Sequence, residues 1–228
     1  MHAARWRTRV ALTLAAFTVT TATATATTAT AAPAGAAATA PSPVTRVTAT
    51  TTATTTATGA RLAGVDYATW QRDVSAALGQ AHSYIEQRTA PPSDRRLAVV
   101  LDIDNTSLET DFHYFWEYPT PAVRPVLDLV RYADSRGVDV FFVTARPGIL
   151  HAPTACNLRA VGYPVDGLYV RDLPDLFEEV SAYKTAKRAE IEAKGYTIIA
   201  NIGNRPTDLA GGHAERTFKL PDYDGKLS

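Results

Sequence analysis

The stretch LAVVLDIDNT, residues 97–106, decides the fold. Its first five residues are apolar and do not alternate with polar ones, which is typical of a strand buried on both faces of a parallel sheet. Asp102 and Asp104 follow this run directly, with one apolar residue between them. Ligands of open α/β sheets bind outside the carboxyl ends of the strands. The stretch therefore predicts a buried strand that delivers two carboxylates to a ligand site.

Strands and helices alternate along the rest of the folded part. Further apolar runs predict strands at residues 138–146, 167–172, 196–203 and 216–220. Apolar periodicity and glycine stops predict helices at residues 66–88, 121–136, 154–161 and 184–194. This order predicts an α/β fold: an open, Rossmann-like sheet of mainly parallel strands with helices on both faces, a small flap and an N-terminal helix.

The start of the chain differs in composition from the rest, because no Asp or Glu precedes Asp66. Early arginines, a short apolar core at residues 10–19 and small-residue A-x-A sites after it predict a secretory signal peptide over residues 1–31. An acid-free, arginine-bearing start also suits an organelle transit peptide, which stays the alternative. The apolar core is too short to span a bilayer, so the sequence predicts a secreted, extracellular protein without a transmembrane segment.

Residues 32–59 are rich in Ala, Thr and Pro and hold almost no large apolar side chains, which predicts a disordered spacer. Such a spacer could associate the protein with a cell wall. Residues 60–228 are long enough for one folded domain with a full core. The lone Cys156 excludes an internal disulfide and is expected to be a small buried side chain.

The predicted domain is mildly acidic. Four of the 23 basic residues lie before residue 60, which leaves 19 basic residues in the domain against all 23 acidic ones. A domain with this balance has no electrostatic footprint for nucleic acid, so no nucleic acid partner is expected.

Other polar side chains follow the second and fourth predicted strands. Thr144 lies at the end of the second strand, Lys184 opens a helix further on, and Asn204 and Asp208 follow the fourth strand. Because the carboxyl ends of parallel strands meet at one edge of a sheet, these side chains should converge with the two carboxylates. Oxygen ligands of this kind suit Mg²⁺. On its own, the acidic pair would equally suit the cap of a strand-to-loop turn.

Four short stretches carry a resemblance to a known family. LDIDNT, FFVTARP, YKTAKR and GNRPTDL, at residues 101–106, 141–147, 183–188 and 203–209, resemble the four motifs of the haloacid dehalogenase (HAD) superfamily. The sequence around these motifs is similar to that of the acid phosphatase branch with a minimal cap (subfamily IIIB, class B-like). One D-x-D-x-T motif alone is weak, but four motifs in order, each after a predicted buried strand, are specific.

The resemblance implies a magnesium-dependent acid phosphatase that forms a phosphoaspartate intermediate. Asp102 would be the nucleophile, and Asp104 would act as general acid and then as general base. The resemblance implies catalytic roles for Asp102, Asp104 and Lys184, substrate binding by Thr144, Ala145, Arg146 and Lys184, and Mg²⁺ binding by Asp102, the backbone carbonyl of Asp104, Asn204 and Asp208. An ion-paired surface side chain is the alternative reading of Arg146.

The fourth motif departs from the family pattern. Asn204 stands where members commonly carry Asp. An amide oxygen can still bind Mg²⁺, but one negative charge is lost, so we expect Asn204 to bind the metal more weakly than Asp would. The Asn204→Asp variant should therefore bind Mg²⁺ more tightly.

The segment DFHYFWEY, residues 111–118, follows the first motif, where the family has a flap over the cleft. Its aromatic side chains either stack on an aromatic leaving group or pack under the loop as a satellite core, and the second reading is favoured for most of them.

The sequence thus predicts a secreted phosphomonoesterase acting on a small phosphate ester, such as a nucleotide or an aryl phosphate. Two alternatives stay open: a catalytically weakened phosphate-binding or storage protein, and a phosphotransferase that passes phosphate to an alcohol.

Overall fold

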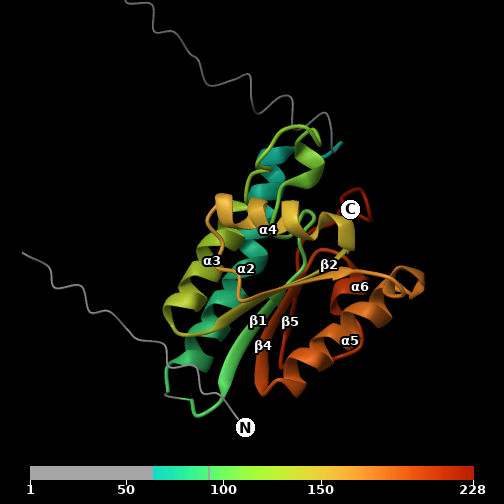
Figure 1. Ribbon diagram of the computed structural model, residues 1–228. Coiled ribbons are helices and arrows are strands. Elements are labelled where there is room, and N and C mark those ends of the chain that lie inside the picture. Colours follow the sequence, from blue (N-terminus) through green and yellow to red (C-terminus); the bar gives the residue numbers. More distant parts are fainter. Residues whose placement is uncertain (1–63, 92) are drawn as a thin grey trace, which may run out of the picture. The chain divides into compact units, whose positions relative to one another are not determined.

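The computed structural model describes residues 64–91 and 93–228 (Figure 1). The predicted signal peptide and the whole predicted spacer, residues 1–59, lie outside the described residues. Among the helices that are described, none has the length and apolar character needed to cross a membrane.

Five parallel strands form one sheet in the order β3-β2-β1-β4-β5. Their bounds are β1 (Arg96–Leu101), β2 (Asp139–Pro147), β3 (Gly167–Arg171), β4 (Tyr196–Gly203) and β5 (Thr217–Lys219). Strand β1, which contains the apolar residues 97–101 that precede Asp102, therefore lies at the centre of the sheet. The α/β prediction is confirmed, including the position of every expected strand to within a few residues.

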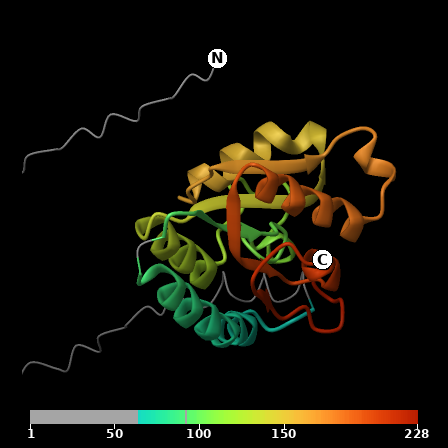
Figure 2. The ribbon, with the colours of Figure 1, turned by 90° about the horizontal axis from the view of Figure 1, so that it is seen from below.

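Helices cover both faces of this sheet (Figures 1 and 2). They are α2 (Tyr67–Thr89), α3 (Arg124–Ser135), α4 (His151–Ala160), α5 (Val180–Ala193) and the short α6 (Pro206–Leu209), with single 3₁₀ turns η1 (Thr110–Phe112), η2 (Gly148–Leu150) and η3 (Asp175–Phe177). The apolar stripe of α2, with Trp70 and Ile85 near its two ends, packs with α3 in the larger core, whereas Tyr183 and Ile191 of α5 pack in a smaller core.

The central strand, β1, contributes side chains to both cores. Val99 and Leu101 belong to the core beneath α2 and α3, while Ala98 and Val100 belong to the core beneath α5. Side chains of a strand alternate between the two faces of its sheet. Asp102, the next residue in the alternation, is thus expected on the α5 side, and this is where its partner lies.

Two local details differ from the sequence-based expectation. The helix expected at residues 184–194 begins at Val180, because the side chain of Glu179 accepts a hydrogen bond from the backbone N–H of Ala182 at 3.0 Å and caps the first turn. Lys184 therefore lies in the second turn of α5 instead of opening the helix. Cys156 of α4 is exposed, so the expectation of a buried side chain was wrong.

Candidate active site

Three charged side chains meet at the carboxyl edge of the sheet. The Lys184 ammonium of α5 donates hydrogen bonds to Oδ1 of Asp102 at 2.5 Å and to Oδ1 of Asp208 at 2.6 Å. Asp102 directly follows β1, and Asp208 lies in α6, just after β4. All three side chains are buried. One ammonium thus joins the first, third and fourth of the quoted stretches.

The electrostatics of this triad are unbalanced. Burial raises the pKa of Asp102 to about 7, and the nearby carboxylates of Asp208 and Asp104 push in the same direction against the opposing effect of Lys184. Burial by itself would lower the pKa of Lys184, but its two carboxylate partners raise it above the ordinary value. The ammonium therefore stays charged, whereas the Asp102 carboxylate lacks sufficient positive charge around it.

One oxygen of Asp102 is left free. Lys184 bonds to Oδ1, and within residues 64–91 and 93–228 no hydrogen bond reaches Oδ2. The buried side-chain polar atoms without a partner in this part of the chain are Nε1 of Trp70 and the hydroxyl of Tyr183. Oδ2 is not one of them, so it keeps contact with solvent. This is the arrangement that a carboxylate nucleophile requires.

Asp104 is held by Arg146. The guanidinium Nη2 donates to Oδ1 at 2.6 Å, and its Nε lies 3.1 Å from Oδ2. Thr110 also donates to Oδ1 of Asp104, at 2.8 Å, and Nη1 of Arg146 reaches Thr154 at 3.1 Å. Arg146 is mostly shielded from solvent, with 19% of its side chain exposed, and it is ion-paired with Asp104.

The remaining substrate-binding candidates lie beside this pair. Thr144 is buried, and its hydroxyl accepts a hydrogen bond from the backbone N–H of Arg146 at 3.2 Å. Ala145 between them is exposed. In the described part of the chain, no hydrogen bond links Thr144 to Asp102 or Lys184. The structure thus forms two neighbouring groups, Asp102 with Lys184 and Asp104 with Arg146.

Asn204 is buried and engaged at both ends of its amide. Its Oδ1 accepts a hydrogen bond from the Thr106 hydroxyl at 3.2 Å, and its Nδ2 donates to the backbone carbonyl of Ser228 at 2.9 Å. Asn105 donates to the same carbonyl at 3.0 Å, and Asp111 accepts a hydrogen bond from the Ser228 N–H at 2.7 Å. Asn204 thus helps to hold Ser228 beside the site, a contact that sequence reasoning missed.

A second set of contacts fixes Asp208. Its backbone carbonyl accepts hydrogen bonds from Asn201 and Arg188, each at 2.9 Å, and its Oδ2 accepts from the Arg205 N–H at 2.7 Å. A Cβ added at Gly203 would lie 2.3 Å from Cβ of Asp208. Only glycine leaves room for this approach, and the glycine before Asn204 was a sequence signal for it.

The predicted magnesium ligands lie among these side chains. In residues 64–91 and 93–228, no group of three His, Cys, Asp or Glu side chains could hold a metal ion. The predicted set also uses an amide and a backbone carbonyl, so its donors are all oxygen atoms, as Mg²⁺ prefers. The carboxylates of Asp102, Asp104 and Asp208 face the cations of Lys184 and Arg146. One excess negative charge remains, and the donor chemistry fits a hard divalent cation.

The aromatic flap after the first motif is largely exposed. Phe112 stacks on Trp70 of α2, with ring centroids 4.3 Å apart, and is buried. Tyr114, Phe115, Trp116 and Tyr118 are exposed instead. The favoured reading, a satellite core under the loop, was therefore wrong for four of the five aromatic residues.

The fold and the edge at which these side chains gather define a HAD-type α/β domain. A family model described as HAD superfamily, subfamily IIIB (Acid phosphatase) matches residues 117–226. Residues 117–226 therefore match a subfamily IIIB acid phosphatase domain, and the resemblance read from the four motifs is confirmed. The match begins after Asp102 and Asp104, and it is the structure that brings this pair to the same edge.

Related proteins and folds agree with this assignment. The chain is 35% identical over 106 residues to a stem 28 kDa glycoprotein of Glycine max, covering 45% of this chain and 42% of that protein. It is 30% identical over 104 residues to acid phosphatase 1 of Solanum lycopersicum, covering 45% and 41%. A solved class C acid phosphatase from Bacillus anthracis has the same fold, with a TM-score of 0.53, 17% identity and coverage of 69% of this chain and 79% of that one.

The matches to curated relatives are partial. The chain spans about two fifths of the length of three curated relatives, the stem glycoproteins of Glycine max. A further relative, vegetative storage protein 1 of Arabidopsis thaliana, is 27% identical over 143 residues, which is 54% of this chain and 53% of that protein. The relatives of this chain thus include a protein named as an acid phosphatase and one named as a storage protein.

Proposed function

We propose that this chain is an acid phosphatase that hydrolyses small phosphate monoesters, with Asp102 as the nucleophile. The observation that carries the proposal is the state of Asp102: it is buried at the carboxyl end of the central strand, one oxygen is held by Lys184, and the other is free. Lys184 would neutralise the nucleophile and draw the phosphoryl group toward it, together with Thr144 and the backbone at Ala145.

The reaction would take two displacements at phosphorus. Oδ2 of Asp102 attacks, the bond from phosphorus to the ester oxygen breaks, and Asp104 gives its proton to the leaving oxygen. Asp104 then takes a proton from a water molecule, whose oxygen attacks the phosphoaspartate. The bond between phosphorus and Asp102 breaks, and inorganic phosphate leaves.

Arg146 adds a condition to this scheme. Its pairing with Asp104 holds that carboxylate in the structure, so Asp104 is not free to carry and pass a proton. We infer that the incoming phosphate attracts the guanidinium away from Asp104, because a phosphate dianion offers Arg the same bidentate geometry with more charge. Substrate binding would thereby release the general acid.

The implied cofactor is Mg²⁺, held by Asp102, the Asp104 carbonyl, Asn204 and Asp208. Bound there, the ion would offset the negative charge shared by the site and the phosphoryl group. The residues around it would orient Asp102 and keep Asp208 in place through Arg188 and Asn201.

Hydrolysis of a chromogenic aryl phosphate tests the proposal, with and without EDTA. We expect Asp102→Asn to lower kcat by about 10³-fold or more, as loss of a nucleophile does in other hydrolases. Asp128→Asn removes an exposed carboxylate of α3 and is the matched control, with unchanged turnover. Turnover of Asp102→Asn at the rate of the unaltered protein would reject the mechanism.

A second candidate, a phosphate-binding or storage protein, is favoured by Asn204. Its amide is occupied by Thr106 and Ser228, and it supplies no negative charge for a metal. This reading predicts tight phosphate binding in calorimetry with no release of aryl alcohol. Turnover that depends on Asp102 would decide against it.

Export remains a separate proposal. Residues 1–31 as a signal peptide and 32–59 as a spacer predict that a secreting host releases a product beginning after residue 31. Amino-terminal sequencing of the released protein tests this, and a product that keeps residues 1–31 would contradict it.

A further inference from the structure

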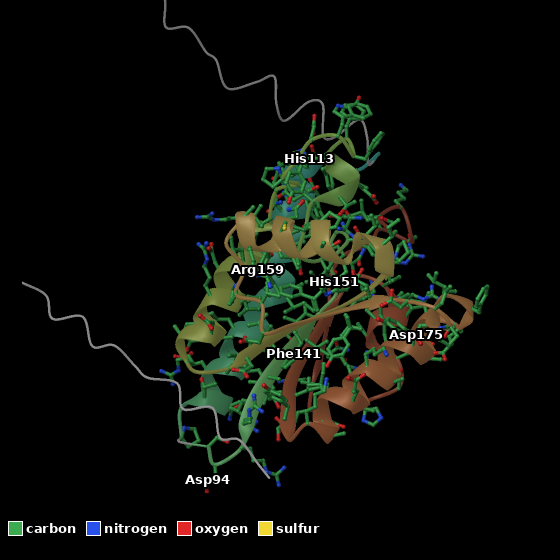
Figure 3. The ribbon with its side chains drawn as sticks, viewed as in Figure 1. Asp94, His113, Phe141, His151, Arg159 and Asp175 are labelled. Carbon is green, nitrogen blue, oxygen red and sulfur yellow. The ribbon has the colours of Figure 1, made fainter. Side chains whose placement is uncertain are left out.

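Two of the contacts that attach the aromatic flap to the domain lie at Thr120 and at His113. At its far end, the backbone N–H of Thr120 donates to the Asn157 amide of α4 at 2.9 Å, and this amide donates to the Thr120 carbonyl at 2.8 Å. At its near end lies His113, which Figure 3 places at the flap, apart from His151 and Asp175. The attachment at Thr120 is neutral, so it does not depend on the ionisation of a side chain, whereas the contacts of His113 do.

His113 lies between two carboxylates. Its Nε2 is 3.2 Å from Oε2 of Glu109, and its Nδ1 is 3.0 Å from Oε2 of Glu117. The same Glu117 oxygen accepts a hydrogen bond from the backbone N–H of Tyr114 at 3.2 Å. We call this set, Glu109, His113 and Glu117, the flap clasp.

The clasp is tied to the body of the domain through α2. Oε1 of Glu109 accepts hydrogen bonds from the Tyr67 hydroxyl at 2.8 Å and from the Gln71 amide at 2.7 Å. Glu109 is 3% exposed, so it forms a fixed point that does not move with the flap. The contacts of His113 and Glu117 therefore connect Tyr114 to α2 through Glu109.

The hydrogen-bond inventory of histidine decides which form of His113 fits. A neutral imidazole has one N–H and one lone pair, whereas the imidazolium has two N–H groups. Carboxylates only accept hydrogen bonds. With a neutral ring, one of the two carboxylates would face the lone pair and be repelled, so both contacts require the doubly protonated ring.

We propose that His113 is a positioning residue whose imidazolium clasps the aromatic flap to α2, and that loss of one ring proton releases the flap. The consequence for catalysis rests on the proposed function: a clasped flap would hold the aromatic leaving group of the ester. The geometry of the clasp itself does not depend on that function.

The charged groups around His113 give the clasp a window of pH. In the described part of the chain, Glu109 and Glu117 contact the ring, and Tyr67 of α2 is the titratable group on the other side of Glu109. Burial raises the pKa of Glu109. As the pH falls, Glu109 therefore takes up a proton and loses its charge at a higher pH than an exposed glutamate does. The clasp thus requires Glu109 to be ionised and His113 to be doubly protonated at the same time.

Release would act on the side chains next to the clasp. Tyr114 directly follows His113, and its ring stacks on Trp116 with centroids 4.5 Å apart and an angle of 6°. Trp116 is 63% exposed. When the bond from Tyr114 to Glu117 is lost, this stack loses its fixed position, and Trp116 becomes accessible from more sides.

Acrylamide quenching of Trp116 fluorescence in the full chain tests the clasp without any need for activity. The Trp116→Phe variant identifies the Trp116 signal against the other tryptophans. We expect quenching to rise as the pH increases, because loss of one ring proton breaks one of the two contacts of His113. In His113→Gln, quenching should be high throughout, with no transition. His213→Gln is the matched control, since His213 pairs with Glu192 alone at 2.6 Å on an exposed surface, and it should keep the transition.

Glu117→Gln gives an independent and opposite result. A glutamine amide can donate to a neutral Nδ1 while Nε2–H donates to Glu109, so the neutral ring satisfies both neighbours. The flap should then stay clasped as the pH increases, with low quenching. A transition that persists in His113→Gln, or that is missing from the unaltered protein, would overturn the clasp.

The kinetic arm links the clasp to the substrate. When the flap is released, KM for an aryl phosphate should rise about fivefold. This factor is at the lower end of the range found when two sites of a protein are coupled. KM for a small aliphatic phosphate and kcat for both esters should stay the same. If the quenching transition occurs and KM for the aryl ester does not change, the role of the flap in substrate binding is rejected. If no ester is hydrolysed, the proposed function fails, while quenching still decides on the clasp.

Discussion

The ammonium of Lys184 lies 2.5 Å from Asp102, and the Lys184 side chain is 3% exposed, so the central charge pair of the site is largely removed from solvent. The same ammonium lies 2.6 Å from Asp208. A cation shared by two buried carboxylates has a structural as well as a chemical role, because neither carboxylate has another cation in direct contact among the described residues.

Replacement of Lys184 by methionine is expected to destabilise the domain. It would leave Asp102 and Asp208 buried without a countercharge, and breaking a buried ion pair typically costs about 3–5 kcal/mol of unfolding free energy. Urea unfolding measures the change. Lys187→Met, one turn along α5, removes a partly exposed pair with Asp175 at 3.2 Å and should cost less than about 1 kcal/mol. Equal effects of the two substitutions would contradict the structural role.

Gly203→Ala tests the close approach of β4 to Asp208. The added Cβ would lie 2.3 Å from the Cβ and 2.6 Å from Oδ2 of Asp208, so either the strand end or the carboxylate must shift. We expect a loss of about 1–3 kcal/mol of stability, as for other overpacked sites, together with lower turnover.

Gly79→Ala is the matched control for this prediction. Gly79 lies inside α2, and no atom lies within 4 Å of the position of its added Cβ. Alanine in a helix interior is favoured over glycine by about 0.5–1 kcal/mol, so this variant should unfold at a higher urea concentration. A Gly203→Ala protein as stable as Gly79→Ala would show that Asp208 can move away freely.

The sheet and the place of the first carboxylate were predictable from short-range patterns. The apolar run before Asp102 marked β1 as buried on both faces, and the alternation of Ala98 to Leu101 between two cores then fixes which face Asp102 takes. The helix that carries Lys184 was also foreseen, although its start was misplaced because Glu179 caps a turn that has no apolar periodicity.

Side-chain partners between distant segments were not predictable in the same way. The pair of Asp104 and Arg146 spans 42 positions, and the contact of Asn105 with Ser228 spans 123. Such pairs depend on the packing of whole elements, and a single sequence shows only the residue types. The exposure of Trp116 could not be foreseen either, since an aromatic run suits a core as well as a surface.

The pH dependence of stability should show the unfavourable charge on Asp102. Its folded pKa, about 7, lies above the ordinary value of 3.8, so the folded protein binds the proton more tightly than the unfolded chain does. The contribution of Asp102 to the free energy of unfolding is therefore present at low pH and is lost as the pH rises from about 4 to 7.

Urea unfolding at several pH values in EDTA measures this slope. Relative to Asp102→Asn, which cannot ionise, the unaltered protein should lose about 1 kcal/mol or more between pH 4.5 and 7.5. Asp128→Asn is the control and should follow the unaltered protein. Parallel curves for the unaltered protein and Asp102→Asn would show that Lys184 fully compensates the buried charge.

Asn204→Asp separates the metal role of this position from its structural role. A carboxylate restores the charge that the family pattern supplies, so the magnesium concentration for half-maximal activity should fall about tenfold, in proportion to the added attraction. The carboxylate cannot donate to the Ser228 carbonyl, which Asn204 does at 2.9 Å, so without metal the variant should lose about 1 kcal/mol of stability. Asn105→Asp loses its bond to the same carbonyl at 3.0 Å but lies outside the predicted metal set, and it should lose stability without any gain in magnesium affinity. A magnesium activation curve that is the same for Asn204→Asp and the unaltered protein would remove Asn204 from the metal site.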